Sequence, residues 1–280
     1  MSIEVRNLTH RYASVGGDGV LAVDDLSLTV EEGEWVAIIG HTGSGKSTFV
    51  RHLNGLTRPT SGEVQVEDYL VSAEGKPDLR GLRRMVGLVF QYPEQQLFEE
   101  TVAREIAFGP KNWGVTGEEL DRVVAQAMEM VGLGPEFAER NPFALSGGQK
   151  RRVAIASVLA SGPKYLVLDE PTAGLDAQGR RDLLELLAGI NARGVTLLQV
   201  THDMDIAFGC ASKILALEKG RKVFYATPQE GAAYLREHPV VGLKLPPLVE
   251  LALALRDCGK NVPVTASSRA FLKGGFGLGS

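Results

Sequence analysis

Apolar and polar positions alternate near the start of the chain in the way that is typical of β-strands. The alternation is loose over residues 3–8 and regular over residues 26–30, and a two-residue period predicts strands with one buried face. A glycine-rich stretch at residues 15–19 predicts a loop between them. Residues 35–39 form a short, wholly apolar run, which predicts a strand that is buried on both faces.

Strand and helix patterns then alternate along most of the remaining chain. Short apolar runs predict strands at residues 85–90, 165–168, 196–200 and 214–217. Apolar spacing and flanking residues predict helices at residues 47–54, 118–131, 147–159, 182–191 and 248–256. This order predicts an α/β fold with a mostly parallel sheet that is covered by helices. Between about residues 92 and 160 helices follow one another, which predicts an inserted helical subdomain.

Composition and charge narrow the class of protein. Of the 280 residues, 44% are hydrophobic and 23% are charged, as in ordinary soluble globular proteins. The formal net charge of -4 argues against a general nucleic-acid binder, which carries a basic excess. The sequence shows neither a spanning apolar run nor the apolar core of a signal peptide. Cys210 and Cys258 have no metal-ligand spacing, so we expect a cytoplasmic protein that reaches the membrane through partners.

A glycine-rich segment connects the apolar run at residues 35–39 to the first predicted helix. It consists of Gly40, His41, Thr42, Gly43, Ser44, Gly45, Lys46, Ser47 and Thr48. The segment contains the P-loop pattern, G-x-x-x-x-G-K-[ST], in its strand-to-helix context. Backbone N–H groups and the helix dipole favour phosphate binding there. We expect Lys46 to reach the terminal phosphates and the Ser47 hydroxyl to bind Mg2+.

An acidic pair, Asp169 and Glu170, ends the strand predicted at residues 165–168 and is followed by Pro171. A carboxylate at Asp169 is suited to hold Mg2+ through water, and Glu170 is suited to polarise the attacking water. An acidic pair that begins a surface turn is the ordinary alternative. The P-loop upstream and the proline that follows favour the catalytic interpretation.

Two further residues are candidates for contacts with the nucleotide. His202 follows the strand predicted at residues 196–200, at the edge where parallel sheets bind ligands. From there it would contact the terminal phosphate and hold the attacking water, whereas a structural histidine is the alternative. Tyr12 is suited to stack on adenine, and an exposed aromatic side chain at a strand edge is the alternative.

A second glycine-containing segment, formed by Ser146, Gly147, Gly148 and Gln149, opens the helix predicted at residues 147–159. Taken alone it is an ordinary N-cap, because serine caps helices well. It also creates a second helix N-terminus that is suited to bind an anion. Two copies arranged head to tail would each lend this N-terminus to the nucleotide of the other.

Together these motifs resemble the ATP-binding subunits of ABC transporters over about residues 3–230. The resemblance implies a P-loop NTPase core, an antiparallel β-subdomain at the N-terminus, and two subunits that sandwich two ATP molecules with Mg2+. It implies that Glu170 is the general base, that Gln91 is a ligand of Mg2+ or water, and that His202 senses the γ-phosphate. It also implies that residues 146–149 face the partner's nucleotide and that Asp176 lies in a loop at the dimer interface.

Four local stretches are similar to a narrower group, the energy-coupling factor (ECF) ATPases, and most like the second ATPase of the pair. They are residues 39–45, 90–98, 105–112 and 149–156. Tyr92 departs from the asparagine that is usual in this group. The resemblance implies two domains, an ATP-binding domain at residues 1–240 and a C-terminal extension at residues 241–280 that helps to pair the ATPases.

The ECF resemblance also implies partners. They are a second ABC ATPase, with a heterodimer favoured over a homodimer, a membrane T component and a substrate-binding S component, without nucleic acid. The segment after Gln91 would line a groove for a helix of the T component. There Glu94, Glu99 and Glu100 would attract an arginine, and a solvated acidic surface is the alternative.

The expected function is that of an ATPase at the cytoplasmic face of the membrane that powers uptake of a vitamin or a transition-metal ion. One alternative is the ATPase of an ABC importer outside the ECF group, with a dedicated permease and a binding protein. Another is an ABC ATPase of DNA repair or translation. Those proteins need a long heptad insertion or two sets of motifs, and this sequence has neither.

Overall fold

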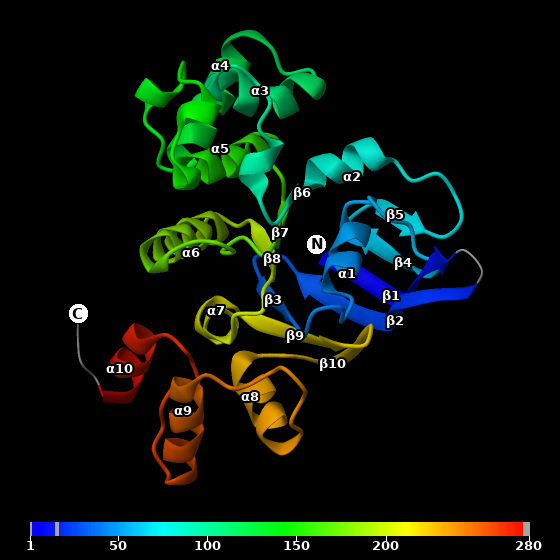
Figure 1. The fold of residues 1–280 in the computed structure, drawn as a ribbon, viewed down its shortest axis with the longest axis vertical. Coiled ribbons are helices and arrows are strands. Elements are labelled where there is room, and N and C mark those ends of the chain that lie inside the picture. Colours follow the sequence, from blue (N-terminus) through cyan, green and yellow to red (C-terminus); the bar gives the residue numbers. More distant parts are fainter. Residues whose placement is uncertain (1, 15–16, 277–280) are drawn as a thin grey trace. The chain divides into compact units, whose positions relative to one another are not determined.

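The computed structural model describes residues 2–14 and 17–276, which form two β-sheets with helices around them (Figure 1). One sheet has four strands in the order β2-β1-β4-β5, and the other has six in the order β10-β9-β3-β8-β7-β6. The chain divides into two units, which we call the P-loop unit (Met1–Pro77 with Leu198–Ser280) and the helix-rich unit (Asp78–Leu197). The boundary lies within β8 (Thr196–Val200).

The four-stranded sheet belongs to the P-loop unit and is antiparallel throughout. Its strands are β1 (Ser2–Ser14), β2 (Gly17–Glu31), β4 (Ser61–Val66) and β5 (Tyr69–Ser72). The buried positions alternate as the sequence pattern requires, since Ile3 and Val5 are 0% and 2% exposed. This confirms the antiparallel β-subdomain that was expected at the N-terminus.

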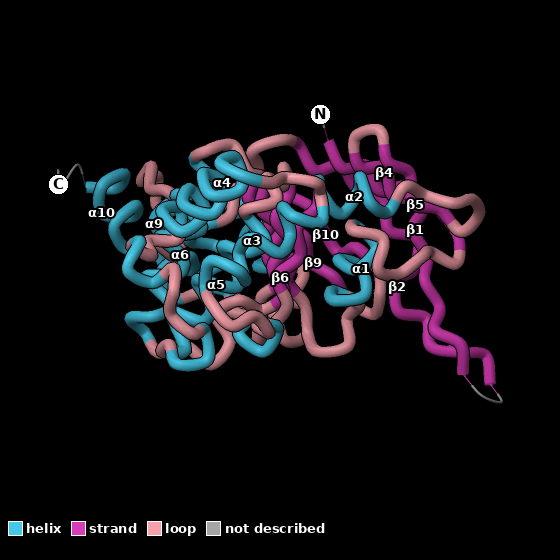
Figure 2. Tube along the Cα trace, turned by 90° about the horizontal axis from the view of Figure 1, so that it is seen from above, coloured by secondary structure: helices cyan, strands magenta, loops and turns pink. Residues whose placement is uncertain are grey.

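The loop predicted at residues 15–19 is shorter than expected. β1 and β2 pair as far as Ser14 and Gly17 and form a long two-stranded hairpin (Figure 2), while residues 15 and 16 lie outside the described residues. Gly19 has a φ of +70°, and a Cβ placed there would lie 2.3 Å from the backbone oxygen of Tyr12. The glycine is therefore needed because the two backbones approach each other closely, and it does not mark a loop.

The six-stranded sheet is mostly parallel, as predicted. In the P-loop unit, β3 (Trp35–Ile39) pairs in parallel with β9 (Lys213–Glu218), and β10 (Arg221–Ala226) adds an antiparallel edge. All five residues of β3 are buried, which agrees with the wholly apolar run in the sequence. The helices of this unit are α1 (Lys46–Leu53), α7 (Met204–Cys210), α8 (Pro228–Glu237), α9 (Pro247–Asp257) and α10 (Ser268–Phe276).

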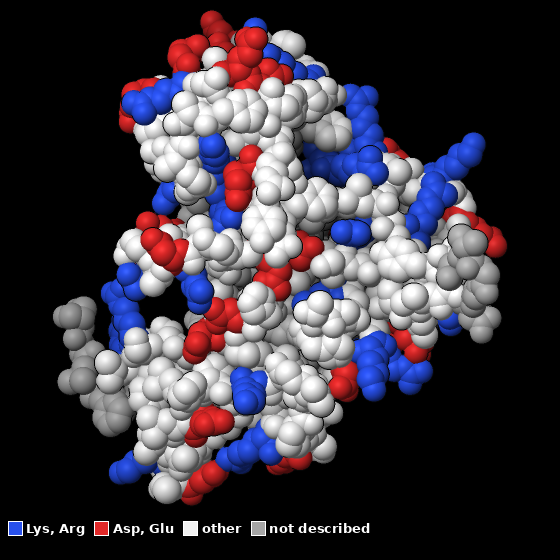
Figure 3. Space-filling view, viewed as in Figure 1, with Lys and Arg blue, Asp and Glu red and all other residues white. Residues whose placement is uncertain are grey.

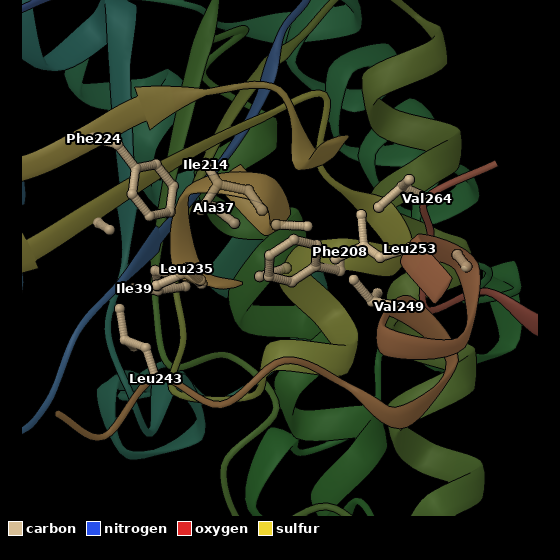
Figure 4. Close-up of a cluster of buried hydrophobic side chains, with 14 of the residues drawn as sticks. Ala37, Ile39, Phe208, Ile214, Phe224, Leu235, Leu243, Val249, Leu253 and Val264 are labelled. Carbon is tan, nitrogen blue, oxygen red and sulfur yellow. The ribbon is translucent and has the colours of Figure 1, made fainter. Parts of the chain in front are cut away.

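The residues after position 240 share a hydrophobic core with the six-stranded sheet (Figure 4). Val249 and Leu253 of α9 and Val264 of the following segment belong to the same cluster as Phe208 of α7 and Ile214 of β9. The C-terminal extension therefore packs as a part of the P-loop unit. The glycine-rich sequence at residues 274–279 falls partly in α10, which continues to Phe276, and residues 277–280 lie outside the described residues.

We expect Leu253→Ala to lower the free energy of unfolding by about 2–4 kcal/mol, because it removes a buried side chain and leaves a cavity. Leu253 is 7% exposed, whereas Leu251 on the same helix is 49% exposed. Leu251→Ala is the matched control, and we expect it to change stability by about 0.5 kcal/mol or less. Urea unfolding of the full chain measures both, and equal effects would show that α9 is not part of this core.

The helix-rich unit contains a parallel pair of strands, β6 (Val86–Val89) and β7 (Tyr165–Asp169), together with the start of β8. Its helices are α2 (Leu79–Met85), η1 (Pro93–Gln96), α3 (Val102–Asn112), α4 (Gly117–Met130), η2 (Pro135–Phe137), η3 (Pro142–Ala144), α5 (Gly147–Leu159) and α6 (Ala177–Ala192). Every element between β6 and β7 is helical, in a segment that is described throughout. The succession of helices predicted there is confirmed.

The surface charges and the lengths of the helices also bear on the class of protein. Acidic and basic side chains are mixed on the face drawn in Figure 3. Among the described residues, no helix combines the length and the apolar character that crossing a membrane requires.

Candidate active site

The predicted P-loop leaves the end of β3 and leads into α1, and its shape depends on glycine. Gly40 and Gly45 have φ angles of +148° and +100°. A Cβ at Gly40 would lie 2.3 Å from the backbone oxygen of Leu217, and one at Gly45 would lie 2.3 Å from that of Ala22. Any other residue would therefore push the loop away from β9 and β2, which explains the glycines in structural terms.

Lys46 crosses back over the loop from the first turn of α1. Its ammonium group donates to the backbone oxygens of Gly40 at 2.7 Å and His41 at 2.9 Å, and the residue is 9% exposed. The Ser44 hydroxyl is buried and has no hydrogen-bond partner within the described part of the chain. A polar, glycine-lined loop with a buried cation and an unpaired hydroxyl suits a phosphate group.

Tyr12 of β1 is joined to the first turn of α1, because its hydroxyl lies 3.2 Å from the hydroxyl of Thr48. The ring is 39% exposed and makes an edge contact with His10, whose ring in turn contacts His52. Burial lowers the pKa of His52 to about 4, so this imidazole is neutral at physiological pH. The chain of rings holds Tyr12 beside the P-loop helix while leaving part of its face open.

His202 lies directly after β8 in the P-loop unit. The preceding residue, Thr201, donates its N–H to the backbone oxygen of Ile38 at 3.1 Å, and the following residue, Asp203, caps α7. Since Ile38 belongs to β3, the ends of β3 and β8 lie side by side. The P-loop follows the end of β3, and His202 follows the end of β8. His202 therefore lies at the same end of the parallel strands as the P-loop, and its contact with the nucleotide stays a prediction.

The helix-rich unit brings the other candidates for catalysis to neighbouring strand ends. Val89 of β6 lies opposite Leu168 of β7, and Gln91 follows the first strand while Asp169 and Glu170 end the second. Glu170 has a φ of +49°, a left-handed conformation that is uncommon for a residue with a side chain; Asn7, Asp25, Glu67 and Lys219 share it.

A hydrogen-bonded turn follows Glu170. The N–H of Ala173 donates to the backbone oxygen of Glu170 at 3.0 Å, and the N–H of Leu175 donates to the backbone oxygen of Thr172 at 3.2 Å. Asp176 then caps α6 by accepting from the N–H of Gly179 at 2.7 Å. This cap explains why α6 begins at Ala177, earlier than the helix predicted at residues 182–191, because the first turn is polar and does not register in an apolar pattern.

The segment at residues 146–149 begins α5 with a reciprocal cap. Ser146 accepts from the N–H of Gln149 at 3.3 Å, and the Gln149 side chain accepts from the N–H of Ser146 at 3.1 Å. The N-cap interpretation is thus correct for these side chains. Gly147 and Gly148 are exposed, and a Cβ on either would meet nothing within 4 Å. Packing within the chain therefore does not require glycine at these two positions. The N-terminus of α5 is accessible to a ligand from outside the chain.

Sequence reasoning missed Arg151, whose side chain is buried in α5. It pairs with Glu94 at 3.2 Å, and Glu100 pairs with Arg104. Two of the three carboxylates that were expected to attract a partner's arginine are therefore engaged within the chain. Arg151 precedes the buried Ile155 and Leu159 by four and eight residues, and a charged residue at this helical spacing was the available signal. Its partners, however, are far away in the sequence.

Comparison with known proteins agrees with this geometry. The family profile described as "ABC transporter" matches residues 23–173. A solved structure with a TM-score of 0.76 and 31% identity, covering 92% of this chain and 96% of that chain, is cbiO1 from Clostridium perfringens, described as part of the ABC transporter complex cbiONQ. The dimeric structure of a bacterial ABC transporter cassette has a TM-score of 0.70 and 32% identity, covering 80% of this chain and 98% of that chain.

Two curated relatives are both described as "Energy-coupling factor transporter ATP-binding protein EcfA2". The protein from Symbiobacterium thermophilum is 50% identical over 263 residues, which cover 94% of this chain and 91% of that protein. The protein from Bacillus licheniformis is 43% identical over 259 residues, which cover 92% and 90%. The chain belongs to the ABC transporter family, in the group of ECF transporter ATP-binding proteins. This confirms the predicted P-loop ATPase fold, the ECF resemblance and an ATPase activity that is coupled to transport.

Proposed function

We propose that this chain is the ATP-hydrolysing subunit of an ECF importer that takes up a vitamin or a transition-metal ion. The observation that carries the proposal is the similarity, at 43–50% over nine-tenths of the chain, to proteins that are named as ECF ATP-binding subunits. Its partners are a second ABC ATPase, in a heterodimer, a membrane T component and a substrate-binding S component. The chain then works at the cytoplasmic face of the membrane, attached through these partners.

The residues of the P-loop unit bind the nucleotide. Backbone N–H groups of residues 40–48 and the ammonium group of Lys46 hold the phosphates, while Tyr12 stacks on adenine. The Ser47 hydroxyl, Asp169 and Gln91 would hold Mg2+ directly or through water. When bound, the ion neutralises charge on the phosphate oxygens. Among the described residues no group of three or more His, Cys, Asp or Glu is arranged as a metal site.

Hydrolysis requires a general base and a residue that orients the attacking water. It also requires hydrogen-bond donors for the phosphates of the nucleotide that the partner subunit binds. Glu170 takes the proton of the attacking water, and His202 holds the γ-phosphate and the water in line. Ser146, Gly147, Gly148 and Gln149 present the start of α5 to the nucleotide on the partner's P-loop. Asp176 lies at the interface that closes around the two nucleotides. The bare glycines at the start of α5 support this assignment.

We expect Tyr12→Ala to weaken ATP binding by about fivefold to 30-fold, because loss of stacking on a base costs about 1–2 kcal/mol. Tyr12→Phe keeps the ring and loses only the hydrogen bond to Thr48, so it should stay close to the wild type. Titration with a fluorescent ATP analogue measures both variants. Equal affinity of Tyr12→Ala and the wild type would remove Tyr12 from the adenine site.

The experiment that tests the proposed function is purification of the full chain from gently solubilised membranes, with mass spectrometry of every protein that accompanies it. A second ABC ATPase, a T component and small S components are the expected partners. A dedicated permease pair with a binding protein would instead make the chain an ABC importer ATPase outside the ECF group. Soluble partners alone would contradict a role in transport.

A further inference from the structure

Arg151 lies near the start of α5, and its side chain is only 6% exposed. Its guanidinium group donates hydrogen bonds to two separate segments of the helix-rich unit. One is η1, through the carboxylate of Glu94, and the other is the turn after Glu170, through the backbone oxygens of Pro171 and Ala173. A buried arginine thus connects α5 with η1, which follows Gln91, and with the turn that follows Glu170.

The geometry uses the whole guanidinium group. Nε and Nη2 donate to the two carboxylate oxygens of Glu94 at 3.2–3.3 Å. Nη1 donates to the oxygen of Pro171 at 3.0 Å, and both terminal nitrogens donate to that of Ala173 at 3.3 Å. A planar fork with five donors can bind a carboxylate and two carbonyl groups at once, whereas a lysine ammonium cannot reproduce this arrangement.

The two carbonyl groups belong to the turn that begins at Glu170. Pro171 and Ala173 are the first and third residues after Glu170, and the N–H of Ala173 closes the turn on the oxygen of Glu170 at 3.0 Å. Glu170 itself has a φ of +49°. A left-handed conformation at a residue with a side chain costs free energy that surrounding contacts must offset, and Arg151 bonds to two carbonyl groups directly after it.

Arg151 is also close in the sequence, or bonded, to the segments that contain Gln149 and Gln91. Glu94 follows Gln91 by three residues, and Arg151 follows Gln149 by two. Arg151 therefore links the start of α5 and the segment after Gln91 to the turn that begins at Glu170. Arg152, the next residue of α5, instead donates to the backbone oxygen of Val131 at the end of α4 and has no such connection.

We propose that Arg151 is a positioning residue that holds Glu170 in its hydrolytic conformation and couples it to residues 146–149 and to Gln91. Through this coupling, engagement of the start of α5 by the partner's nucleotide places Glu170 for attack. The inference rests on the proposed function, since it assumes that Glu170 is the general base.

The test compares Arg151→Met with Arg152→Met in the full chain, purified with its co-expressed partner proteins. We expect Arg151→Met to lower kcat for ATP hydrolysis about 100-fold, because a catalytic group misplaced by about 1 Å costs that much. The KM for ATP should change less than about threefold, since Arg151 bonds to Glu94, Pro171 and Ala173, whereas the proposed phosphate ligands are P-loop residues. Arg152→Met should keep kcat within about threefold of the wild type.

Two milder variants keep the test decisive if Arg151→Met does not fold. Arg151→Lys retains the charge without the fork, and Glu94→Gln retains the shape without the charge, so both should lower kcat about tenfold with little effect on KM. Hydrogen exchange provides an independent readout. The amides of residues 170–176 should exchange faster in Arg151→Met than in Arg152→Met.

The inference is overturned if the Arg151 variants keep the kcat of the wild type, if they raise only KM, or if Arg152→Met loses as much activity as Arg151→Met. Glu170→Gln, measured alongside, separates this inference from the proposed function. An inactive Glu170→Gln with an active Arg151→Met contradicts only the role of Arg151. An active Glu170→Gln contradicts the role of Glu170 as base, and the positioning role falls with it.

Discussion

Glu170→Gln should abolish ATP hydrolysis and leave ATP binding intact. The amide cannot accept the proton of the attacking water, and a general base contributes about 100-fold to 10,000-fold to a rate. Glutamine has the same shape, so the left-handed conformation of residue 170 and the turn closed by Ala173 should persist. Steady-state hydrolysis and equilibrium binding of ATP measure the two effects separately.

The matched control for this variant is Glu185→Gln, which removes an exposed carboxylate of α6 in the same unit. We expect it to hydrolyse ATP at the rate of the wild type. If Glu170→Gln retains turnover, another group must activate the water, and the assignment of the base is wrong. If it loses ATP binding as well, its effect would be structural rather than catalytic.

Lys46→Ala should weaken ATP binding by about 30-fold to more than 1,000-fold, and hydrolysis should fall with it. Removing one partner of a buried, charge-assisted contact costs about 2–5 kcal/mol. Here the ammonium group is buried and already directed at the loop, where it bonds to the oxygens of Gly40 and His41. It is thus placed to reach phosphates that lie in the same loop.

Loss of the bonds to Gly40 and His41 can also loosen the loop, so thermal unfolding must accompany the binding measurement. Lys76→Ala is the control, because Lys76 is exposed in a connection between β5 and α2. We expect its affinity for ATP to equal that of the wild type. An affinity of Lys46→Ala close to that of the wild type would show that the predicted P-loop does not hold the phosphates.

The features that the sequence predicted well are those whose signal is local. The apolar run of β3, the P-loop and α1 follow one another within about twenty residues, and each constrains the next. Strand β8 (Thr196–Val200) and helix α5 (Gly147–Leu159) have the predicted bounds. A cap or an apolar run lies at each of these boundaries, so no distant contact is needed to define them.

The features that were missed depend on contacts between distant segments. Arg151 bonds to Glu94 and to Pro171 and Ala173, which lie 57, 20 and 22 positions away along the chain, and no periodic pattern reveals such a set. The glycine at position 19 was taken for part of a loop, whereas it permits the close approach of β2 to Tyr12. In both cases the structural role of the residue depends on a neighbour that is distant in the sequence or on another strand.

The C-terminal extension likewise combines a local signal, which the sequence shows, with distant contacts, which it does not show. Its helix, predicted at residues 248–256 and observed at Pro247–Asp257, could be recognised from its apolar residues. The surface on which it packs, which includes Phe208 and Ile214, could not be predicted from the sequence. Its proposed role in pairing the ATPases stays a prediction.

Uptake by sealed vesicles that contain the purified assembly, with ATP enclosed on the inner side together with the ATPases, is the decisive measurement of transport by this chain. The vesicles are offered a mixture of vitamins and transition-metal ions, and mass spectrometry identifies what accumulates inside. The proposed function predicts that one such solute accumulates with the wild-type chain and none with Glu170→Gln. Accumulation that is equal in the two preparations, or hydrolysis by the wild type without any uptake, would contradict it.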